Sequence, residues 1–431
     1  MEYKTTDIYL FEVTKNNFHY SKSLGESIYF LKQFKATNSN PKLWKKAMTK
    51  FFWYRILQFW RNKSWKRFQP QETPYAQYLQ KNGNILLFTH ELSLSGAPRA
   101  LLTLASVLKQ CGKNPIIISP MQGEMREEAT QMGITTIVDP LLEFKLCKKD
   151  NNLFSFLKKC EVLFFNTLDN LHFCLYTQDI KTRKIGWIHE GISSYINKFI
   201  HVNEKALSTL EEIYVVGEYA KAFAVEHAPL GKSIKTLLYG CEDIPTPSFP
   251  TPPHEAKVKI LMIGTVDQRK GMHLLNQAVE CLPEVVRQKI KITVVGKPIC
   301  KSIAKDLANS KYECLKYIGQ KTHEEVISLF KECDILLCPS LDDPMPIVCT
   351  EAMILKKVII VSDHTGTASF IKNNDNGFVI PAGSPQAIAD AIQTSLTRRE
   401  TFDRIGQEAR MIYEQNFTME VFKKNVEQIF R

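Results

Sequence analysis

Two carboxylates eight positions apart are the residues of this chain best placed to do chemistry. Asp343 and Glu351 follow a strand-like run at 334–340, and a second apolar run lies at 357–362. Apolar residues return at helical spacing between the runs, which predicts strand, loop, helix and strand. Both carboxylates would then face the rim where parallel sheets bind ligands. An ionised carboxylate accepts from neighbouring hydroxyls, as sugar binding requires, although surface acids on an ordinary loop and helix would show the same spacing.

Adjacent cations follow another predicted strand. Arg269 and Lys270 lie in the loop 264–271, directly after the apolar run 258–264. A diphosphate leaving group needs positive charge, and cations at the carboxyl end of a strand can supply it. The alternative is a solvated basic turn.

The first half of the chain has weaker candidates. Gly96 lies in the loop 93–98, which joins a predicted strand at 84–89 to a helix at 99–108. A glycine there lets a ligand approach the backbone, and free N–H groups at a helix start can meet a phosphate. A plain turn between strand and helix is the alternative.

Three further polar residues end or follow predicted strands. His189 and Glu190 come after the strand 185–188, and Asn166 ends the strand 162–166. A lone histidine is more often structural than functional, and an asparagine here could equally cap a helix. Their shared place at strand ends nevertheless predicts that they line one edge of a sheet.

Strands and helices alternate in two series, which predicts an α/β protein with two Rossmann-like domains that face each other across a cleft. Proline density between the series indicates a spacer. The predicted strands of the first series end at 212–216; they lie at 84–89, 115–119, 135–138, 162–166, 185–188 and 212–216. Those of the second lie at 258–264, 292–296, 334–340 and 358–362. The predicted parts are an N-terminal extension (1–82), a first domain (83–243), a proline-rich linker (244–255), a second domain (256–413) and a C-terminal helix (414–431).

The extension contains a basic, aromatic segment at 42–68. It has nine cations and no acid, so it accounts for most of the net charge of +11. An apolar residue recurs every four positions from Trp44 to Trp60. This composition is typical of a helix that lies on an anionic membrane surface. The alternatives are a helix packed against the protein body and, less favoured because no nucleic-acid module accompanies the charge, RNA binding.

The composition describes a globular protein in a reducing compartment. Hydrophobic residues make up 44% of the chain, and its 11 cysteines form no zinc-type cluster. The first residues show no secretory signal pattern, and no apolar run reaches the roughly 18 residues of a membrane span. We therefore expect a cytoplasmic protein, held peripherally at the inner face of the membrane by residues 42–68, that requires no metal and binds no nucleic acid.

Taken in order, these motifs resemble those of the retaining nucleotide-sugar glycosyltransferases of family 4, which have the GT-B fold. The resemblance covers roughly residue 84 to the C-terminus. The carboxylate pair is similar to the family's Glu-x7-Glu motif, with Asp343 in the first place. By resemblance Asp343 contacts the transferred sugar and Glu351 the ribose of the nucleotide. Pro344 and Pro346 have no N–H, so the backbone donors to the sugar would be those of Met345, Ile347 and Val348.

The resemblance also assigns the remaining candidates. Lys270 falls on the family's lysine, whereas Thr265 stands where the family has an arginine that Arg269 would replace. His189 would contact the donor sugar or its phosphate. Gly96 would lie at the donor, and Glu190 and Asn166 would bind the acceptor.

The implied function is transfer of a sugar from a UDP- or GDP-linked donor to a glycan or lipid-linked acceptor at the membrane, with retention of configuration. His189, Asp343 and Lys270 would be the catalytic residues, and no cofactor is expected. Two alternatives stay open: an inverting GT-B enzyme, and a non-catalytic partner that binds sugar or nucleotide.

Overall fold

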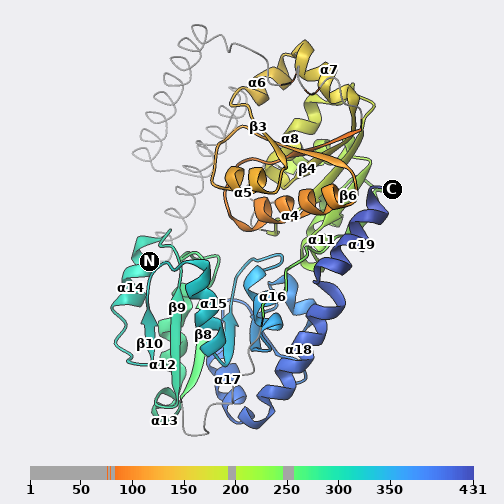
Figure 1. The fold of residues 1–431 in the computed structure, drawn as a ribbon. Coiled ribbons are helices and arrows are strands. Elements are labelled where there is room, and N and C mark those ends of the chain that lie inside the picture. Colours follow the sequence, from red (N-terminus) through yellow and green to blue (C-terminus); the bar gives the residue numbers. More distant parts are fainter. Residues whose placement is uncertain (1–74, 76–77, 79–82, 193–199, 246–256) are drawn as a thin grey trace, which may run out of the picture. The chain divides into compact units, whose positions relative to one another are not determined.

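A computed structural model describes residues 75, 78, 83–192, 200–245 and 257–431 (Figure 1). Nearly all of them belong to one compact unit, residues 78–193 and 200–431. The predicted basic helix at 42–68 and most of the predicted linker at 244–255 lie outside the described residues.

The first sheet is parallel, with strand order β3-β2-β1-β4-β5-β6-β7. Every residue of β1 is buried, as continuous apolar runs predict for a sheet covered on both faces. The strands are β1 (Asn84–Phe88), β2 (Asn114–Ser119), β3 (Thr135–Val138), β4 (Cys160–Asn166), β5 (Arg183–Ile188), β6 (Glu212–Val215) and β7 (Ile234–Thr236).

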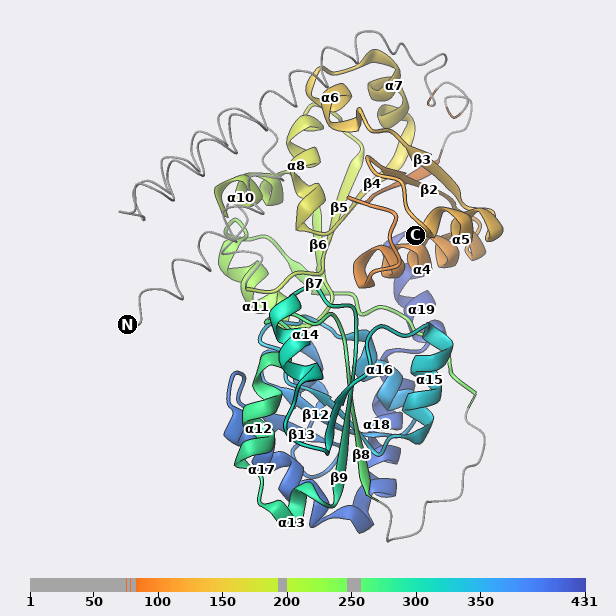
Figure 2. The ribbon, with the colours of Figure 1, turned by 90° about the vertical axis from the view of Figure 1, so that its left-hand side faces the viewer.

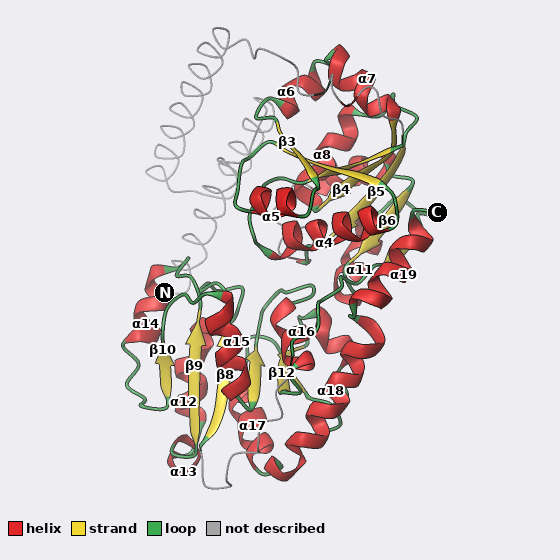
Figure 3. Ribbon diagram, viewed as in Figure 1, coloured by secondary structure: helices red, strands yellow, loops and turns green. Residues whose placement is uncertain are grey.

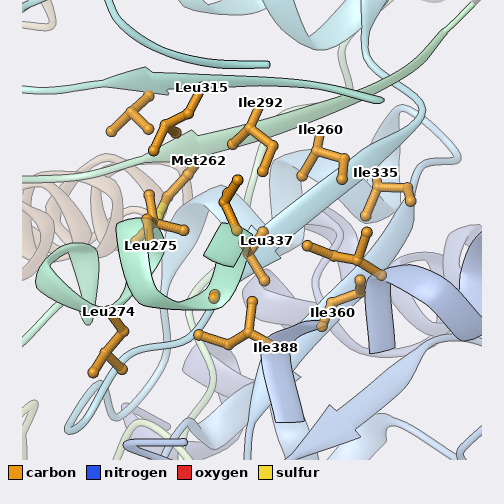
Figure 4. Packing of buried hydrophobic residues seen from close by; sticks show 14 of the residues in the cluster. Ile260, Met262, Leu274, Leu275, Ile292, Leu315, Ile335, Leu337, Ile360 and Ile388 are labelled. Atoms are coloured by element: carbon orange, nitrogen blue, oxygen red, sulfur yellow. The ribbon is translucent and has the colours of Figure 1, made fainter. Parts of the chain in front are cut away.

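The second sheet is also parallel, with strand order β10-β9-β8-β11-β12-β13. Apolar side chains from its strands and from the covering helices form one buried cluster (Figure 4). The strands are β8 (Val258–Ile263), β9 (Ile290–Val295), β10 (Leu315–Tyr317), β11 (Ile335–Cys338), β12 (Val358–Ser362) and β13 (Phe378–Ile380).

Helices cover both sheets (Figure 3). In Figure 2 the second sheet runs between α12, α14 and α17 on one side and α15, α16 and α18 on the other. The first-domain helices are α4 (Gly96–Gln110), α5 (Met125–Gln131), α6 (Leu142–Cys147), α7 (Asn151–Lys159), α8 (Leu168–Tyr176), α10 (Ile200–Thr209) and α11 (Glu218–His227). Those that follow are α12 (Leu275–Cys281), α13 (Glu284–Arg287), α14 (Lys301–Ala308), α15 (His323–Glu332), α16 (Ile347–Ile354), α17 (Pro385–Leu396), α18 (Phe402–Asn416) and α19 (Met419–Ile429), with short 3-10 helices η2 (Met272–Leu274), η3 (Gly366–Phe370) and η4 (Arg399–Thr401).

The prediction that the strand series of the first domain ends at 212–216 was wrong, because β7 follows and pairs with β6. This strand has only three residues, and Lys235 and Thr236 are exposed. A short, polar edge strand has neither the apolar run nor the clear alternation that identifies a strand in sequence.

The strand order reverses once in each sheet, between β1 and β4 and between β8 and β11. Ligands of open parallel sheets bind beyond the carboxyl ends of the strands at such a reversal. The loops after β8 and β11 carry Lys270 and Asp343, and those after β1 and β4 precede Gly96 and Leu168. Both reversals therefore fall at predicted site residues.

The C-terminal helices contact both domains. Arg410 of α18 donates to the carbonyl oxygen of Ile354 in α16 at 3.2 Å. Beyond it, Arg183 of β5 donates to the carbonyl oxygen of Ile429 in α19 at 2.9 Å, and Trp187 stacks on Phe422 with ring centroids 6.3 Å apart. The last helix thus packs on the first domain after the chain has completed the second (Figure 1).

Candidate functional site

The carboxylate of Asp267 holds the loop after β8 in its conformation. Asp267 Oδ2 accepts from the Thr265 hydroxyl at 2.7 Å, and its Oδ1 accepts from the Lys270 backbone N–H at 2.9 Å. Gly271 has φ of 74°, and a side-chain carbon there would overlap the carbonyl oxygen of Pro339 beyond β11. These constraints bring the loop after β8 against the loop after β11.

The Lys270 ammonium forms an ion pair with Asp343 Oδ2. Arg269 Nη1 lies 3.9 Å from the same oxygen and donates to the carbonyl oxygen of Asp342 at 2.9 Å. The Ser340 hydroxyl lies 3.5 Å from Asp343 Oδ2. Asp343 is 7% exposed, so this carboxylate is buried and its charge is balanced by two cations from the neighbouring loop. The structure thus brings together two motifs that the sequence predicted separately, the adjacent cations and the first carboxylate.

Two of the three backbone N–H groups that the resemblance assigns to the sugar lie at the start of α16. The helix begins at Ile347, so the N–H groups of Ile347 and Val348 belong to its first turn, which has no intrahelical acceptors. Thr365 bridges Asp343 in parallel register, and the Gly366 N–H donates to the Asp343 carbonyl oxygen at 3.0 Å. The segment is therefore held from the loop after β12.

Glu351 lies one turn into α16 and is partly buried. Burial raises the pKa of its carboxyl to about 7, against a smaller lowering by the positive charge of Arg99. Arg99 belongs to the first turn of α4, and a side-chain carbon on Gly96 would lie 3.8 Å from Ile347 Cδ1. The start of α4 is therefore close to α16, and Glu351 changes charge near neutral pH.

His189 follows β5 and packs edge-on against Trp187, with ring centroids 4.4 Å apart. Its Nε2 is buried and has no hydrogen-bond partner among the described residues. Burial, with a smaller effect of His90, lowers the pKa of His189 to about 3. The imidazole is therefore neutral at physiological pH, when it can exchange hydrogen bonds but is a very weak base.

Glu190 and Asn166 are held by their own domain. Glu190 accepts from the backbone N–H groups of Leu168 and His189, each at 3.0 Å, through its two carboxylate oxygens. Asn166 is fully buried and donates to the carbonyl oxygen of Ala97 in α4 at 3.0 Å. These contacts fix the starts of α8 and α4, and the predicted contacts with an acceptor stay a prediction.

Two further residues build this region, and sequence reasoning missed Tyr239. Tyr239, beyond β7, donates to the Met345 carbonyl oxygen at 3.3 Å and lies 3.1 Å from the Thr350 hydroxyl. Thr167 has a left-handed φ of 74°, which is rare for a β-branched residue, and its hydroxyl lies 3.4 Å from His90 Nδ1. A tyrosine after a weak strand has no pattern that marks it, whereas the place of Thr167 directly after a strand end predicts that it lines the same edge of the sheet as Asn166.

Comparisons with known proteins agree with the two-domain fold. The profile of glycosyl transferases group 1 matches residues 243–411, and that of glycosyl-transferase family 4 matches residues 81–213. HepE of Anabaena, solved in complex with UDP-glucose, superposes with a TM-score of 0.67 at 16% identity, over 80% of this chain and 98% of HepE. A likeness at that identity shows the fold, which is GT-B as predicted.

Curated relatives match over shorter stretches. The amylovoran biosynthesis glycosyltransferase AmsK of Erwinia amylovora is 28% identical over 33% of this chain and 37% of its own length. The O-antigen chain mannosyltransferase C of Escherichia coli is 25% identical over 37% of this chain and 42% of its own. The chain thus spans well under half the length of these two relatives. Since the two profiles match most of both sheets, with the loops that carry Asp343, Lys270 and His189, the chain belongs to the GT-B glycosyltransferases of family 4.

Proposed function

We propose that the chain is a retaining glycosyltransferase that takes a sugar from a nucleoside-diphosphate sugar, linked to UDP or GDP. The observation that carries this proposal is the group of Arg269, Lys270 and Asp343 at the reversal point of the second sheet. A buried carboxylate beside two cations provides both an acceptor for sugar hydroxyls and positive charge for a diphosphate.

In this proposal the second domain binds the donor. Lys270 and Arg269 stabilise the charge that develops on the departing diphosphate, and the N–H groups of Met345, Ile347 and Val348 orient the sugar. Glu351 accepts from the ribose hydroxyls in its ionised form. The protein thereby contributes positioning and charge stabilisation, while the leaving phosphate itself removes the proton of the acceptor hydroxyl.

The state of His189 and Glu190 favours this route over inversion, which needs a dedicated base on the acceptor side. The pKa of His189 is lowered to about 3, so its imidazole takes up a proton poorly. Both oxygens of Glu190 accept from backbone N–H groups. We assign His189 to hydrogen bonding with the donor sugar or its phosphate, and the cations to the role that a metal ion has in other transferases.

We further propose a membrane-associated glycan or lipid-linked acceptor in surface polysaccharide synthesis, and a peripheral place at the cytoplasmic face. The basic, aromatic segment 42–68 supports this proposal. None of the described helices is long and apolar enough to cross a membrane. AmsK, one of the relatives, is named for amylovoran biosynthesis.

Sedimentation with vesicles tests the membrane contact. We expect binding to vesicles with anionic lipid, and its loss when Lys45, Lys50 and Lys63 are changed to Gln. A matched control changes three exposed lysines of the first domain instead: Lys148, Lys158 and Lys181. Equal loss in the control, or unchanged binding in the first variant, would contradict a specific role of 42–68.

The reaction itself is tested by incubating the full chain with UDP- and GDP-linked sugars and following donor hydrolysis and transfer by NMR. We expect turnover of one donor with the anomeric configuration kept, and no turnover by Lys270→Ala. Inverted product would favour the inverting alternative. Tight nucleotide binding without any turnover would favour the non-catalytic one.

A further inference from the structure

Asp342 is a buried carboxylate to which the proposed reaction assigns no role. It precedes Asp343 and is only 5% exposed. Its backbone carbonyl oxygen accepts from Arg269 Nη1 at 2.9 Å, so the residue already orients one of the two cations beside Asp343. A carboxylate is costly to bury, so the groups that surround it bear on its role.

Two first-domain residues face this carboxylate. A side-chain carbon on Gly191, two residues beyond His189, would overlap Asp342 Oδ1 and would lie 3.0 Å from Tyr219 Cε1. Tyr219 belongs to the first turn of α11. The ring of Tyr219 also lies 6.1 Å from that of His364, in the loop after β12. Asp342 thus reaches across from the second domain into a space that only a glycine leaves open.

The Tyr219 hydroxyl is suited to pair with Asp342. It is buried and has no hydrogen-bond partner among the described residues, and burial is the main reason that the pKa of Tyr219 is raised, followed by the negative charge of the nearby Asp342. Asp363 and Asp343 also act on the phenol in the same direction but less strongly. The phenol therefore stays protonated at physiological pH and can donate to the carboxylate.

We propose that Asp342 is a positioning residue that couples the approach of the two domains to the placement of Arg269. Its carboxylate offers an acceptor to the buried Tyr219 hydroxyl of the first domain, unpartnered within the described part of the chain, while its carbonyl holds the Arg269 guanidinium beside Asp343. When the domains separate, the Asp342 side chain loses its first-domain neighbour. The Asp342 carbonyl oxygen is then no longer fixed in position as the acceptor of Arg269. The proposal rests on the proposed function, which assigns Arg269 to the diphosphate of the donor.

The first experiment compares Tyr219→Phe, Asp342→Ala and the double variant in donor binding and turnover. The donor lies on the second domain, so its Kd should change less than about threefold, whereas kcat should fall about tenfold or more in each single variant. The double variant should be no slower than the worse single one, because both remove the same contact. Additive losses, or a wild-type kcat in both single variants, would overturn the proposal.

Tyr214→Phe is the matched control. The Tyr214 hydroxyl donates to a carboxylate oxygen of Glu212 at 2.9 Å, so the chemistry is the same, but both residues lie in the first domain. We expect its kcat to stay at the wild-type value. A fall as large as that of Tyr219→Phe would show a general effect of losing a tyrosine hydroxyl and would count against the coupling.

A rescue experiment tests the close approach of Gly191 to Asp342. Gly191→Ala places a methyl group onto Asp342 Oδ1 and should hold the domains apart, with a larger fall in kcat than either change above. Combining it with Asp342→Ala removes the obstructing atoms, so the double variant should be faster than Gly191→Ala alone and about as fast as Asp342→Ala alone. A double variant slower than Gly191→Ala would contradict this arrangement.

A readout without substrate separates this proposal from the proposed function. Cys147 of the first domain and Cys281 of the second are both exposed and can carry spin labels. We expect one narrow distance distribution in the wild type and a broader one, extended to longer distances, in Tyr219→Phe and Asp342→Ala but not in Tyr214→Phe. Identical distributions would overturn the coupling even if the enzyme is active, and a shift would support it even if no donor is turned over.

Discussion

The two sheet edges that carry the candidate residues differ in their chemistry. At the reversal point of the second sheet, Lys270 and Arg269 meet Asp343, so the site is built from charge. At that of the first sheet, Asn166 and Glu190 hold backbone groups of their own domain, and the nearby His189 is kept neutral by burial. In the proposed function, the charged edge of the second sheet stabilises the diphosphate, and the edge of the first sheet contributes neutral hydrogen-bonding groups.

Removal of Lys270 should have the largest effect. Lys270→Ala leaves the Asp343 carboxylate with one distant cation and the donor diphosphate without its nearest charge. We expect turnover to fall about 100-fold or more and the free energy of unfolding to fall by about 3 kcal/mol, because a buried charge has lost its partner. Turnover assays and denaturant unfolding measure the two quantities.

The double variant Lys270→Met with Asp343→Asn separates the role of this ion pair in stability from its role in turnover. Removing both charges should restore most of the free energy of unfolding but none of the turnover. If it restored turnover as well, the pair would be structural, and the second domain would not differ from the first in the way proposed.

Glu351 should make donor affinity depend on pH. Burial raises the pKa of its carboxyl to about 7, and only the ionised form is a pure acceptor for ribose hydroxyls. We expect the affinity for a nucleotide sugar to fall several-fold between pH 8 and pH 6, and about tenfold weaker, pH-independent binding by Glu351→Gln. A nucleotide sugar is the right ligand because its phosphodiester groups do not titrate in this range.

The same carboxyl has the opposite effect on stability. Its folded pKa of about 7 lies above the ordinary 4.5, so its contribution to the free energy of unfolding is fully present below pH 4.5 and is lost as the pH rises through about 7. Glu351→Gln should therefore gain stability over the wild type at pH 8 and not at pH 4.5. A constant difference at both pH values would contradict the raised pKa.

At the edge of the first sheet, Glu190→Gln tests whether the two sheet edges have different roles. A glutamine can accept only one of the two backbone N–H groups that Glu190 now binds, so we expect a loss of about 1–2 kcal/mol in the free energy of unfolding. Transfer to an acceptor should slow while the donor Kd is unchanged. If Glu190→Gln lost as much donor affinity as Glu351→Gln, the assignment of the donor to the second domain alone would be contradicted.

Substitutions of Thr167 should have the smallest effect on stability, and this effect should come from the backbone of that one residue. Its φ of 74° strains a residue with a β-carbon, and glycine would relieve that strain. Both Thr167→Gly and Thr167→Ala lose the hydroxyl contacts with His90 and Asn170, at 3.4 and 3.2 Å. We expect the glycine variant to be more stable than the alanine variant by about 1 kcal/mol, the reverse of the usual order. Equal melting temperatures would show that the backbone carries little strain here.

The buried parts of the fold could be predicted because their strands are continuous apolar runs. Thr135–Val138 and Val358–Ser362 have the predicted bounds, whereas the edge strands β7, β10 and β13 have three residues each and were not predicted. So short a segment carries too few side chains to show a period. The sheet order also follows from long-range pairing, which one sequence does not display.

The site was predicted in pieces. Lys270 and Asp343 each stood out from their motif, yet they are 73 residues apart, and only the fold shows that they pair. Asp342 went unassigned although it adjoins Asp343, because its role depends on Gly191 and Tyr219 of the other domain. Burial decides the chemistry of Glu351 and His189, and burial of one polar residue cannot be read from its neighbours in sequence.

Calorimetry with UDP and GDP tests most directly the claim that the charged edge of the second domain holds a nucleoside diphosphate. The wild type is compared with Lys270→Ala and Glu351→Ala, and with Tyr214→Phe as a folded control. We predict micromolar binding of one nucleotide by the wild type and the control, and its loss in both site variants. A folded wild type that binds neither nucleotide, or site variants that bind as tightly as the wild type, would contradict the account.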